Sequence, residues 1–210
     1  MRKPRDGENT KEIVIAAARQ VFAKRGFEGT SLAMISKECG ISDGLILHHF
    51  QNKKNLYQAV LENLAQDYTT NFIQSKESSS SPQELMQKTL MSTFDYWKQD
   101  TTYQRISLWS YLEGQNELVE KEAAFTAGMY QEVKRLQDQG FIDSRFSPIF
   151  LLTMVIGPIH FWLRYREQFQ KAIHFDETTE ELDQLFINQL IQLVMEMARN
   201  PIGSDSNKKE

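Results

Sequence analysis

One predicted helix of about eight residues, following Ser42, has an outward face with unusual chemistry for a protein surface. Ile46 and Phe50 lie four residues apart and are expected to pack inward, which leaves the opposite face exposed. That face presents Asp43, Gly44, Leu47 and His48. In the major groove of DNA a leucine can contact a thymine methyl group, and a histidine can donate to a base edge or a phosphate. The face therefore predicts contact with DNA, the alternative for His48 and His49 being an ordinary surface or half-buried pair.

Groups that could bind phosphate flank this helix. Helix N-termini expose N–H groups that bind anions, and the sequence predicts two of them, at Thr30–Ser31 and at Asn52, with Lys53 and Lys54 adding charge beside the second. Residues 1–55 hold 10 Lys and Arg against 6 Asp and Glu, a net charge of +4, whereas residues 56–210 hold 14 against 22, a net charge of −8. This division favours a polyanion at one end of the chain, although a solvated basic face also explains the count.

Two short helices are expected to position these groups. The first begins at Ser31 and ends at Cys39, where Gly40 allows a tight turn, and Ser42 caps the second. Two helices joined by a short glycine-containing turn form the helix-turn-helix arrangement, whose second helix enters the major groove.

The rest of the chain is also predicted to be helical. Apolar residues recur at spacings of three and four throughout, and Pro and Gly are scarce, at 5 and 10. We expect an all-α fold of about nine helices, with Asn9 capping the first, Asn52 the fourth, and Thr178 in a capping box that begins the last. Gly157-Pro158 is expected to kink or split the eighth helix.

Other features of the sequence narrow the class of protein. A single cysteine excludes an intramolecular disulfide, and no His, Cys or carboxylate group has metal-ligand spacing. No apolar segment follows the basic N-terminus, and the longest apolar run, residues 149–163, is shorter than the roughly 20 residues of a membrane-spanning helix. We therefore expect a cytoplasmic protein with no cofactor, no metal and no membrane partner. The sequence lacks the GxSxG, P-loop, GxGxxG and HExxH motifs, which argues against an enzyme.

Residues 10–57 closely resemble the N-terminal DNA-binding domain of TetR-type transcriptional regulators. The residues that carry the resemblance are Phe22, Gly26, Phe27, Thr30, Ser31, Ile35, Ser36, Gly40, Ile41, Ser42, Ile46, His49, Phe50, Asn52, Lys53 and Leu56. The resemblance implies a DNA-binding domain over residues 1–55 and a ligand-binding and dimerisation domain over residues 56–203, and we expect a disordered tail over residues 204–210. The predicted DNA contacts are Thr30, Ser31, Ser42, Asp43, Gly44, Leu47, His48, His49, Lys53 and Lys54.

Three residues depart from the family pattern. Leu47 stands where the family usually has a tyrosine that reaches a backbone phosphate, so one positioning contact is absent. Lys54 replaces the usual glutamate and returns positive charge. Asp43 replaces a residue that is often basic or small; phosphates repel its carboxylate, which can accept a hydrogen bond from cytosine N4. We predict that Asp43 contributes to sequence preference while it lowers general affinity.

The resemblance further implies that helices five to seven enclose a small-molecule site and that the last two helices form a homodimer. Residues 56–210 hold 20 of the 23 aromatic residues. Although such rings are often core, apolar walls with a few polar tips are also typical of ligand pockets. The predicted pocket residues are Phe94, Trp97, Tyr103, Trp109, Tyr111, Phe125, Met129 and Tyr130.

The sequence thus predicts a ligand-responsive regulator of transcription. We expect a repressor that binds a palindromic DNA operator as a homodimer and is released by a small apolar or amphipathic effector. The alternative is a DNA-binding regulator that has no small-molecule ligand and is controlled by a protein partner. A cavity lined by Trp97, Trp109 or Tyr103 would favour the first, and a filled core the second.

Overall fold

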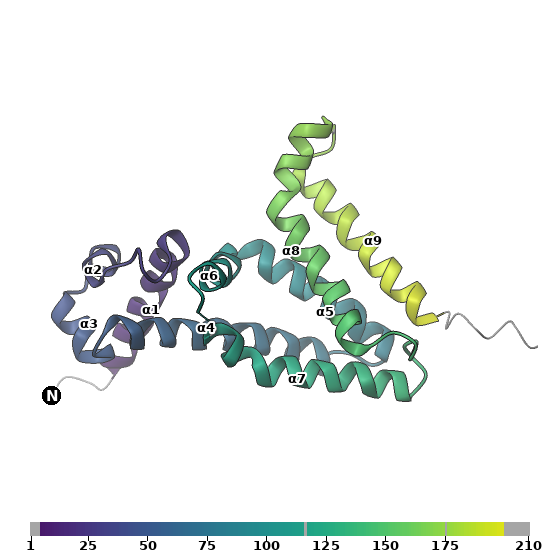
Figure 1. Cartoon of the computed structure of the whole chain (residues 1–210), viewed down its shortest axis with the longest axis horizontal. Coiled ribbons are helices and arrows are strands. Elements are labelled where there is room, and N and C mark those ends of the chain that lie inside the picture. The colour runs from purple at the N-terminus through teal and green to yellow at the C-terminus, as the bar shows by residue number, and fades with distance from the viewer. Residues whose placement is uncertain (1–4, 116, 175, 200–210) are drawn as a thin grey trace, which may run out of the picture. The chain divides into compact units, whose positions relative to one another are not determined.

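A computed structural model describes residues 5–115, 117–174 and 176–199. Over these residues the chain forms nine α-helices and no strand, arranged as Figure 1 shows. They are α1 (Arg5–Arg25), α2 (Leu32–Cys39), α3 (Asp43–Phe50), α4 (Lys53–Glu77), α5 (Pro82–Gln99), α6 (Thr101–Leu112), α7 (Glu117–Asp138), α8 (Pro148–Ile173) and α9 (Thr179–Arg199). The predicted all-α class is confirmed.

Local capping sets several helix ends where the sequence predicts them. The side-chain oxygens of Ser31, Ser42 and Asn52 each accept a hydrogen bond from the backbone N–H three residues later, at 3.3, 3.4 and 2.8 Å. Gly40 ends α2 with a φ of 70°, a left-handed conformation that glycine adopts without strain. Residues 178–181 form the predicted capping box at the start of α9.

One prediction about a helix end was wrong, and one about the eighth helix is narrowed. The first helix begins at Arg5, so Asn9 lies inside it and does not cap it. The polar residues before Thr10 show no apolar periodicity, but a helix that is already nucleated extends through such residues at little cost. Of the two outcomes expected at Gly157-Pro158, a split is excluded, because α8 continues through both residues to Ile173, and the kink stays a prediction.

The chain divides into two compact units. Unit 1 comprises the residues up to Tyr68 together with Asp100–Ala123, and unit 2 comprises Thr69–Gln99 and the residues from Ala124 onward. These units do not follow the predicted domain boundary at residue 55, because α6 and the first half of α4 pack with α1. The helices α4 and α7 each contribute to both units.

Unit 1 has its core between α1, α2, α3 and α4. Phe22, Ile35 and Ile46 are fully buried, and Phe50 is nearly so; for Ile46 and Phe50 this is as the sequence predicts. The rings of Phe22 and Tyr57 meet edge to face with centroids 4.8 Å apart. The ring contact joins α1 to α4, and the burial of Ile46 and Phe50 leaves the other face of α3 exposed.

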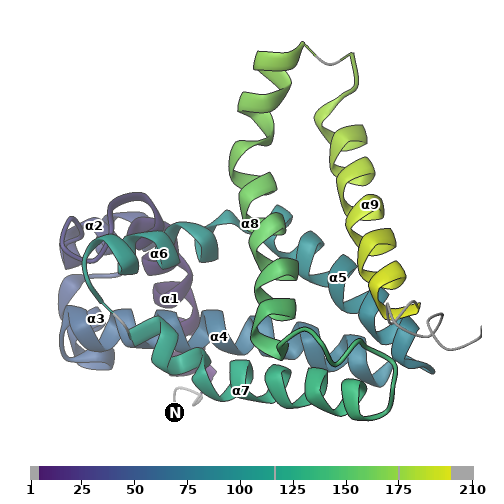
Figure 2. The ribbon, with the colours of Figure 1, turned by 45° about the vertical axis from the view of Figure 1, so that its right-hand side comes forward.

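Unit 2 contains the hairpin of α8 and α9, seen well in Figure 2. Asp183 on α9 is buried and accepts hydrogen bonds from Trp162 Nε1 at 2.8 Å and from Arg166, both on α8. Lys98 on α5 lies 3.3 Å from the same carboxylate. A single buried charge therefore holds three helices together at one end of this unit.

Candidate functional site

The outward face of α3 is exposed, as the sequence predicts. Asp43, Gly44 and His48 are exposed, and Leu47 keeps 42% of its surface accessible. Leu45 is equally exposed, at 41%, and was not among the predicted contacts. The face can therefore offer two leucines, a carboxylate and a histidine to a partner.

Two of the predicted phosphate contacts have their polar groups engaged within the protein. The Thr30 hydroxyl is buried and donates to Gly26 O at 2.7 Å. The Lys53 ammonium donates to Phe27 O at 2.8 Å and to Thr30 O at 2.9 Å, and it lies 4.2 Å above the Phe27 ring. Both side chains shape the connection between α1 and α2, and only the third N–H of Lys53 is outside these bonds.

The remaining predicted contacts lie on the surface of unit 1. Ser31 and Ser42 are exposed at helix N-termini, and His49 is half-buried with its ring 5.4 Å from that of His48. The Lys54 side chain is 64% exposed and lies 3.4 Å from Glu117, a pair too exposed to fix its position.

A tight turn joins α3 to α4. The N–H of Asn52 donates to Phe50 O at 2.8 Å across Gln51, whose φ of 70° and ψ of −43° place it in a γ-turn. This conformation is rare and strained for a residue with a side chain. The turn sets the angle between the exposed helix and the long α4.

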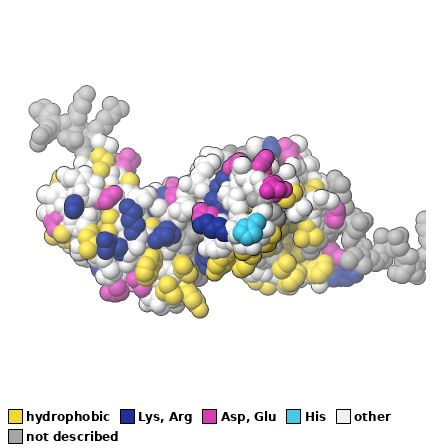
Figure 3. Space-filling model, turned by 90° about the horizontal axis from the view of Figure 1, so that it is seen from above, with side chains coloured by type: hydrophobic (Ala, Val, Ile, Leu, Met, Phe, Trp, Pro, Cys, Tyr) yellow, Lys and Arg dark blue, Asp and Glu magenta, His cyan; other side chains and the backbone are white. Residues whose placement is uncertain are grey.

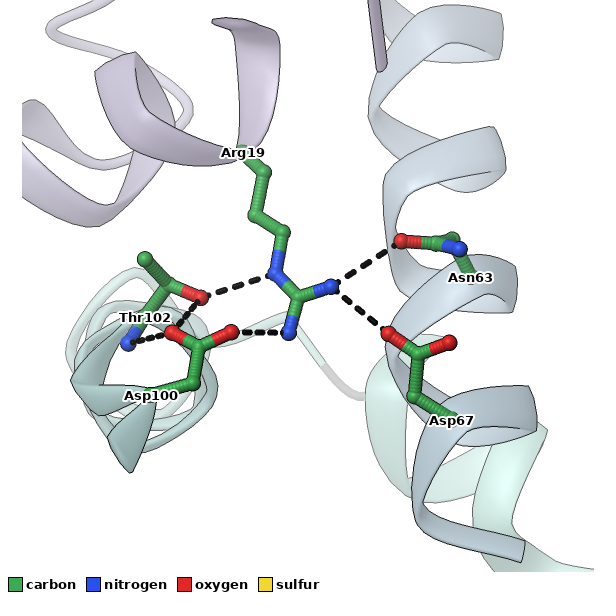
Figure 4. Close-up of polar contacts among 5 residues, drawn as sticks. All are labelled: Arg19, Asn63, Asp67, Asp100 and Thr102. Atoms are coloured by element: carbon green, nitrogen blue, oxygen red, sulfur yellow. Dashed lines mark hydrogen bonds and ion pairs between the residues drawn. The ribbon is translucent and has the colours of Figure 1, made fainter. Parts of the chain in front are cut away.

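Arg19, which no sequence pattern singled out, joins α1 to α4 and α6 (Figure 4). Its guanidinium donates to Asn63 at 3.1 Å and Asp67 at 2.7 Å on α4, to Thr102 at 2.8 Å on α6, and to Asp100, the N-cap of α6. A planar guanidinium group that donates to carboxylates and to other side-chain oxygens forms strong, directional hydrogen bonds. No local pattern announces them, because the partners lie 44 to 83 residues away in the sequence.

One face of α6 holds the end of α1. Arg105 donates to Ala23 O at 2.8 Å, and Glu113 accepts from the N–H groups of Phe27 and Glu28 at 3.1 and 3.2 Å. Gly26 has a φ of 71°, which favours glycine, and a Cβ atom there would lie 2.3 Å from Glu113 Oε1 and 3.0 Å from the Trp109 ring. These contacts make α6 part of the support of the helix-turn-helix.

Most of the predicted pocket residues do not line the apolar cavity that unit 2 contains. Phe94 and Trp97 are buried in unit 2, where the Trp97 ring stacks on His160 with centroids 3.9 Å apart. Burial, with Arg164 nearby, lowers the pKa of His160 to about 4. Phe125 packs against Phe72 with centroids 5.4 Å apart, and Tyr130 is exposed.

The other predicted pocket residues lie in unit 1, except Met129. Tyr103 is buried and donates to Glu122, whose pKa is raised by burial in spite of that bond. Trp109 lies against Gly26, and Tyr111 is 82% exposed. Of the eight predicted residues, Met129 alone lines the apolar cavity of unit 2.

That cavity has a volume of about 140 Å³. Its wall is formed by Phe72, Leu85, Met86, Thr89, Leu90, Met129, Glu132, Val133, Leu136, Ile142, Leu151, Leu152, Met154, Val155, Leu190, Leu193 and Val194. An apolar cavity is therefore present, but it is not the one that the ligand hypothesis described, because Trp97, Trp109 and Tyr103 do not line it. Among the described residues, no cluster of His, Cys, Asp and Glu could hold a metal ion.

The family models match most of the chain. Residues 14–60 match the model described as bacterial regulatory proteins of the tetR family, and residues 90–199 match a tetracyclin repressor-like C-terminal domain. Related sequences include the HTH-type transcriptional regulator TtgR of Pseudomonas putida, 27% identical over 77% of this chain and 84% of that protein. The probable regulator ArpR of Pseudomonas putida is 30% identical over 68% of this chain and 63% of that protein.

Solved structures share the fold. A TetR family transcription regulator from Marinobacter aquaeolei has a TM-score of 0.72 at 18% identity, with 92% of this chain and 98% of that chain covered. The regulator FadR from Bacillus subtilis, in complex with stearoyl-CoA, has a TM-score of 0.65 at 16% identity, with 86% and 97% covered.

Proposed function

The chain belongs to the TetR family of bacterial transcriptional regulators, and on that premise we propose that it is a repressor released from a palindromic operator by a small apolar or amphipathic effector. The observation that carries the proposal is the combination, in one chain, of an exposed helix-turn-helix face in unit 1 and an apolar cavity in unit 2. Fold neighbours include a FadR in complex with stearoyl-CoA, which supports regulation by a small molecule.

The proposed operator contacts divide by chemistry. Asp43, Gly44, Leu47 and His48 face the base edges, while Ser31, Ser42, His49 and Lys54 approach the phosphates. Thr30 and Lys53 act mainly through the loop that they hold, and Lys53 has one further donor for a phosphate.

A homodimer through α8 and α9 is proposed because these helices leave large side chains uncovered. The exposed apolar residues are Ile149, Phe150, Met154, Phe161, Tyr165 and Ile173 on α8 and Leu185 and Leu193 on α9. Figure 3 shows hydrophobic side chains gathered on the surface in the right-hand part of that view. A second copy that offers the same face would cover them in a twofold bundle of four helices, and a twofold dimer reads a palindromic site.

A membrane is the competing occupant of this face. The length and apolar composition of α8 would allow it to cross a bilayer, but core helices of soluble proteins often have the same length and composition. Its C-terminal half carries Arg164, Arg166, Glu167 and Lys171, and Arg166 is paired with Asp183 on α9. We therefore propose a cytoplasmic dimer. Sedimentation as a monomer at micromolar concentration, or recovery with membranes, would contradict it.

The proposed mechanism is a population shift. The effector binds two arrangements of the dimer unequally, and helices that contribute to both units, such as α4, carry the change to the reading faces. A coupling of about 1 to 3 kcal/mol would lower operator affinity roughly 5- to 150-fold.

Selection of operator sequences from random DNA tests the function. The unmodified chain should enrich a palindrome, and Asp43→Ala should lose roughly tenfold discrimination at one base pair per half-site while general affinity rises. Asp95→Ala, which removes an exposed carboxylate from α5, is the matched control and should leave the preference unchanged. Failure of the unmodified chain to enrich any sequence would reject sequence-specific DNA binding. An operator preference that is the same in the Asp43→Ala variant would reject the proposed role of Asp43.

A further inference from the structure

The wall of the unit 2 cavity is almost entirely carbon. Fifteen of its seventeen described residues are Leu, Ile, Val, Met or Phe, and none is Lys, Arg or His. The two polar residues are Thr89 on α5 and Glu132 on α7.

Neither polar residue offers a site for a charged ligand. The Glu132 carboxylate is bound by its own neighbour on α7, with Arg135 Nη2 at 2.6 Å and Arg135 Nε at 3.2 Å. The Thr89 hydroxyl is buried and has no hydrogen-bond partner among the described residues. An anion in this cavity would therefore lose its water without gaining a cation, and a cation would compete with Arg135 for the only carboxylate.

The volume sets the size of the part of a ligand that the cavity encloses. An apolar cavity of about 150 Å³ stays dry and holds a benzene molecule, and drug-sized ligands occupy roughly 300–1,000 Å³. A cavity of about 140 Å³ is suited to a molecule of about six to ten non-hydrogen atoms.

We propose that the effector is a small uncharged apolar molecule, such as an alkylbenzene or a short hydrocarbon, and that carboxylates and amines of the same shape are rejected. This rests on the proposed function, because it specifies the effector of the same regulator. It narrows the range of apolar or amphipathic effectors to the uncharged part of that range.

Three small molecules of nearly equal shape and different charge test whether the cavity rejects charged ligands. Toluene, benzoate and benzylammonium are titrated into the full chain at pH 7.5, and binding is followed by calorimetry and by the thermal midpoint of unfolding. We expect toluene to bind and to raise the midpoint, and both ions to bind at least about a hundredfold more weakly. Absence of toluene binding, or comparable affinity for either ion, overturns the proposal. Tight binding of decanoate overturns it as well, because its carboxylate would then be tolerated at the mouth.

Two variants locate the binding site. Val133→Phe adds a ring at the wall and should abolish toluene binding, whereas Ile73→Phe adds a ring at an exposed position of α4 outside the wall and should leave it unchanged. Thr89→Val removes the unpartnered hydroxyl with almost no change of shape and should retain toluene binding within about threefold. Each variant is first checked for an unchanged far-ultraviolet spectrum. Loss of toluene affinity in Ile73→Phe, or full affinity in Val133→Phe, places toluene elsewhere and contradicts the proposal.

Operator binding separates this proposal from the function on which it rests. The DNA selected by the unmodified chain is titrated with and without saturating toluene. Weakened DNA binding supports both. Toluene that binds the cavity and leaves DNA affinity unchanged supports the ligand chemistry and rejects the effector role.

Discussion

Unit 1 and unit 2 differ in what fixes their helices. In unit 1, Arg19, Arg105 and Glu113 join α1 and the residues that follow it to α4 and α6 through directional hydrogen bonds around a core of buried side chains. In unit 2, the polar cluster at Asp183 joins α8 and α9 at one end of the pair. Other residues of the same two helices form part of the wall of the apolar cavity. Hydrogen-bond networks specify one arrangement, whereas apolar packing around a cavity tolerates several. The difference suits a reading surface that needs precision and a sensor that needs adaptability.

The largest expected effect is the response of unit 2 to acid. The folded pKa of His160, about 4, lies below the unfolded value of roughly 6.5. Below pH 6.5 the unfolded chain therefore takes up a proton that the folded chain does not, and stability falls with decreasing pH until about pH 4. The total loss is about 3 kcal/mol, measured by urea unfolding at a series of pH values.

The control for this prediction is His160→Phe, which keeps a ring against Trp97 but does not titrate. Its stability should vary less with pH between 6.5 and 4 than that of the unmodified chain. Identical pH profiles for the two proteins would mean that His160 does not make unit 2 the acid-sensitive part.

A smaller loss is expected from Arg19→Ala in unit 1. The change removes four hydrogen bonds, but Asp67 and Asp100 are partly exposed and can be hydrated again, so we expect about 2 kcal/mol. Chemical unfolding measures the loss, and hydrogen exchange should show faster opening of α1. Arg19→Lys keeps the charge without the planar fork and should recover only part of the loss. Full recovery by lysine would show that charge, and not directional bonding, fixes unit 1.

The smallest expected effect is a gain. Gln51→Gly should stabilise the chain by about 1 kcal/mol. Glycine adopts the positive φ of the γ-turn without strain, and this gain exceeds the entropy cost of ordering a glycine that is more flexible in the unfolded chain. The thermal midpoint measures the gain, and Gln99→Gly, at an exposed helix end, is a control for glycine itself. A destabilised Gln51→Gly would indicate that the side chain, through its bond to Asn55, outweighs the strain.

The features that the sequence predicted are local ones. Ser31, Ser42 and Asn52 cap helices with atoms three residues away, and the inward spacing of Ile46 and Phe50 is enough to assign the exposed face of α3. Arg19 could not be recognised, because its partners are brought together only by the fold.

The cavity was misassigned for a different physical reason. Large rings such as those of Phe94 and Trp97 were expected to surround a ligand, but rings of this size fill the space between helices and become core. Branched and flexible aliphatic side chains, such as Val133, Leu152 and Met129, leave the gap. Their types are those of any helical core, so the sequence contains no signal that separates the wall from ordinary packing.

The contribution of α6 to unit 1 has a practical consequence for chimaeric regulators. A chimaera that joins residues 1–55 to another sensor would carry the reading helix but leave behind Arg105, Glu113 and the partners of Arg19. The graft would then depend on whatever the recipient offers at those positions. Modular exchange in this protein therefore requires two separate stretches of sequence, residues up to Tyr68 and Asp100–Ala123, moved as a pair.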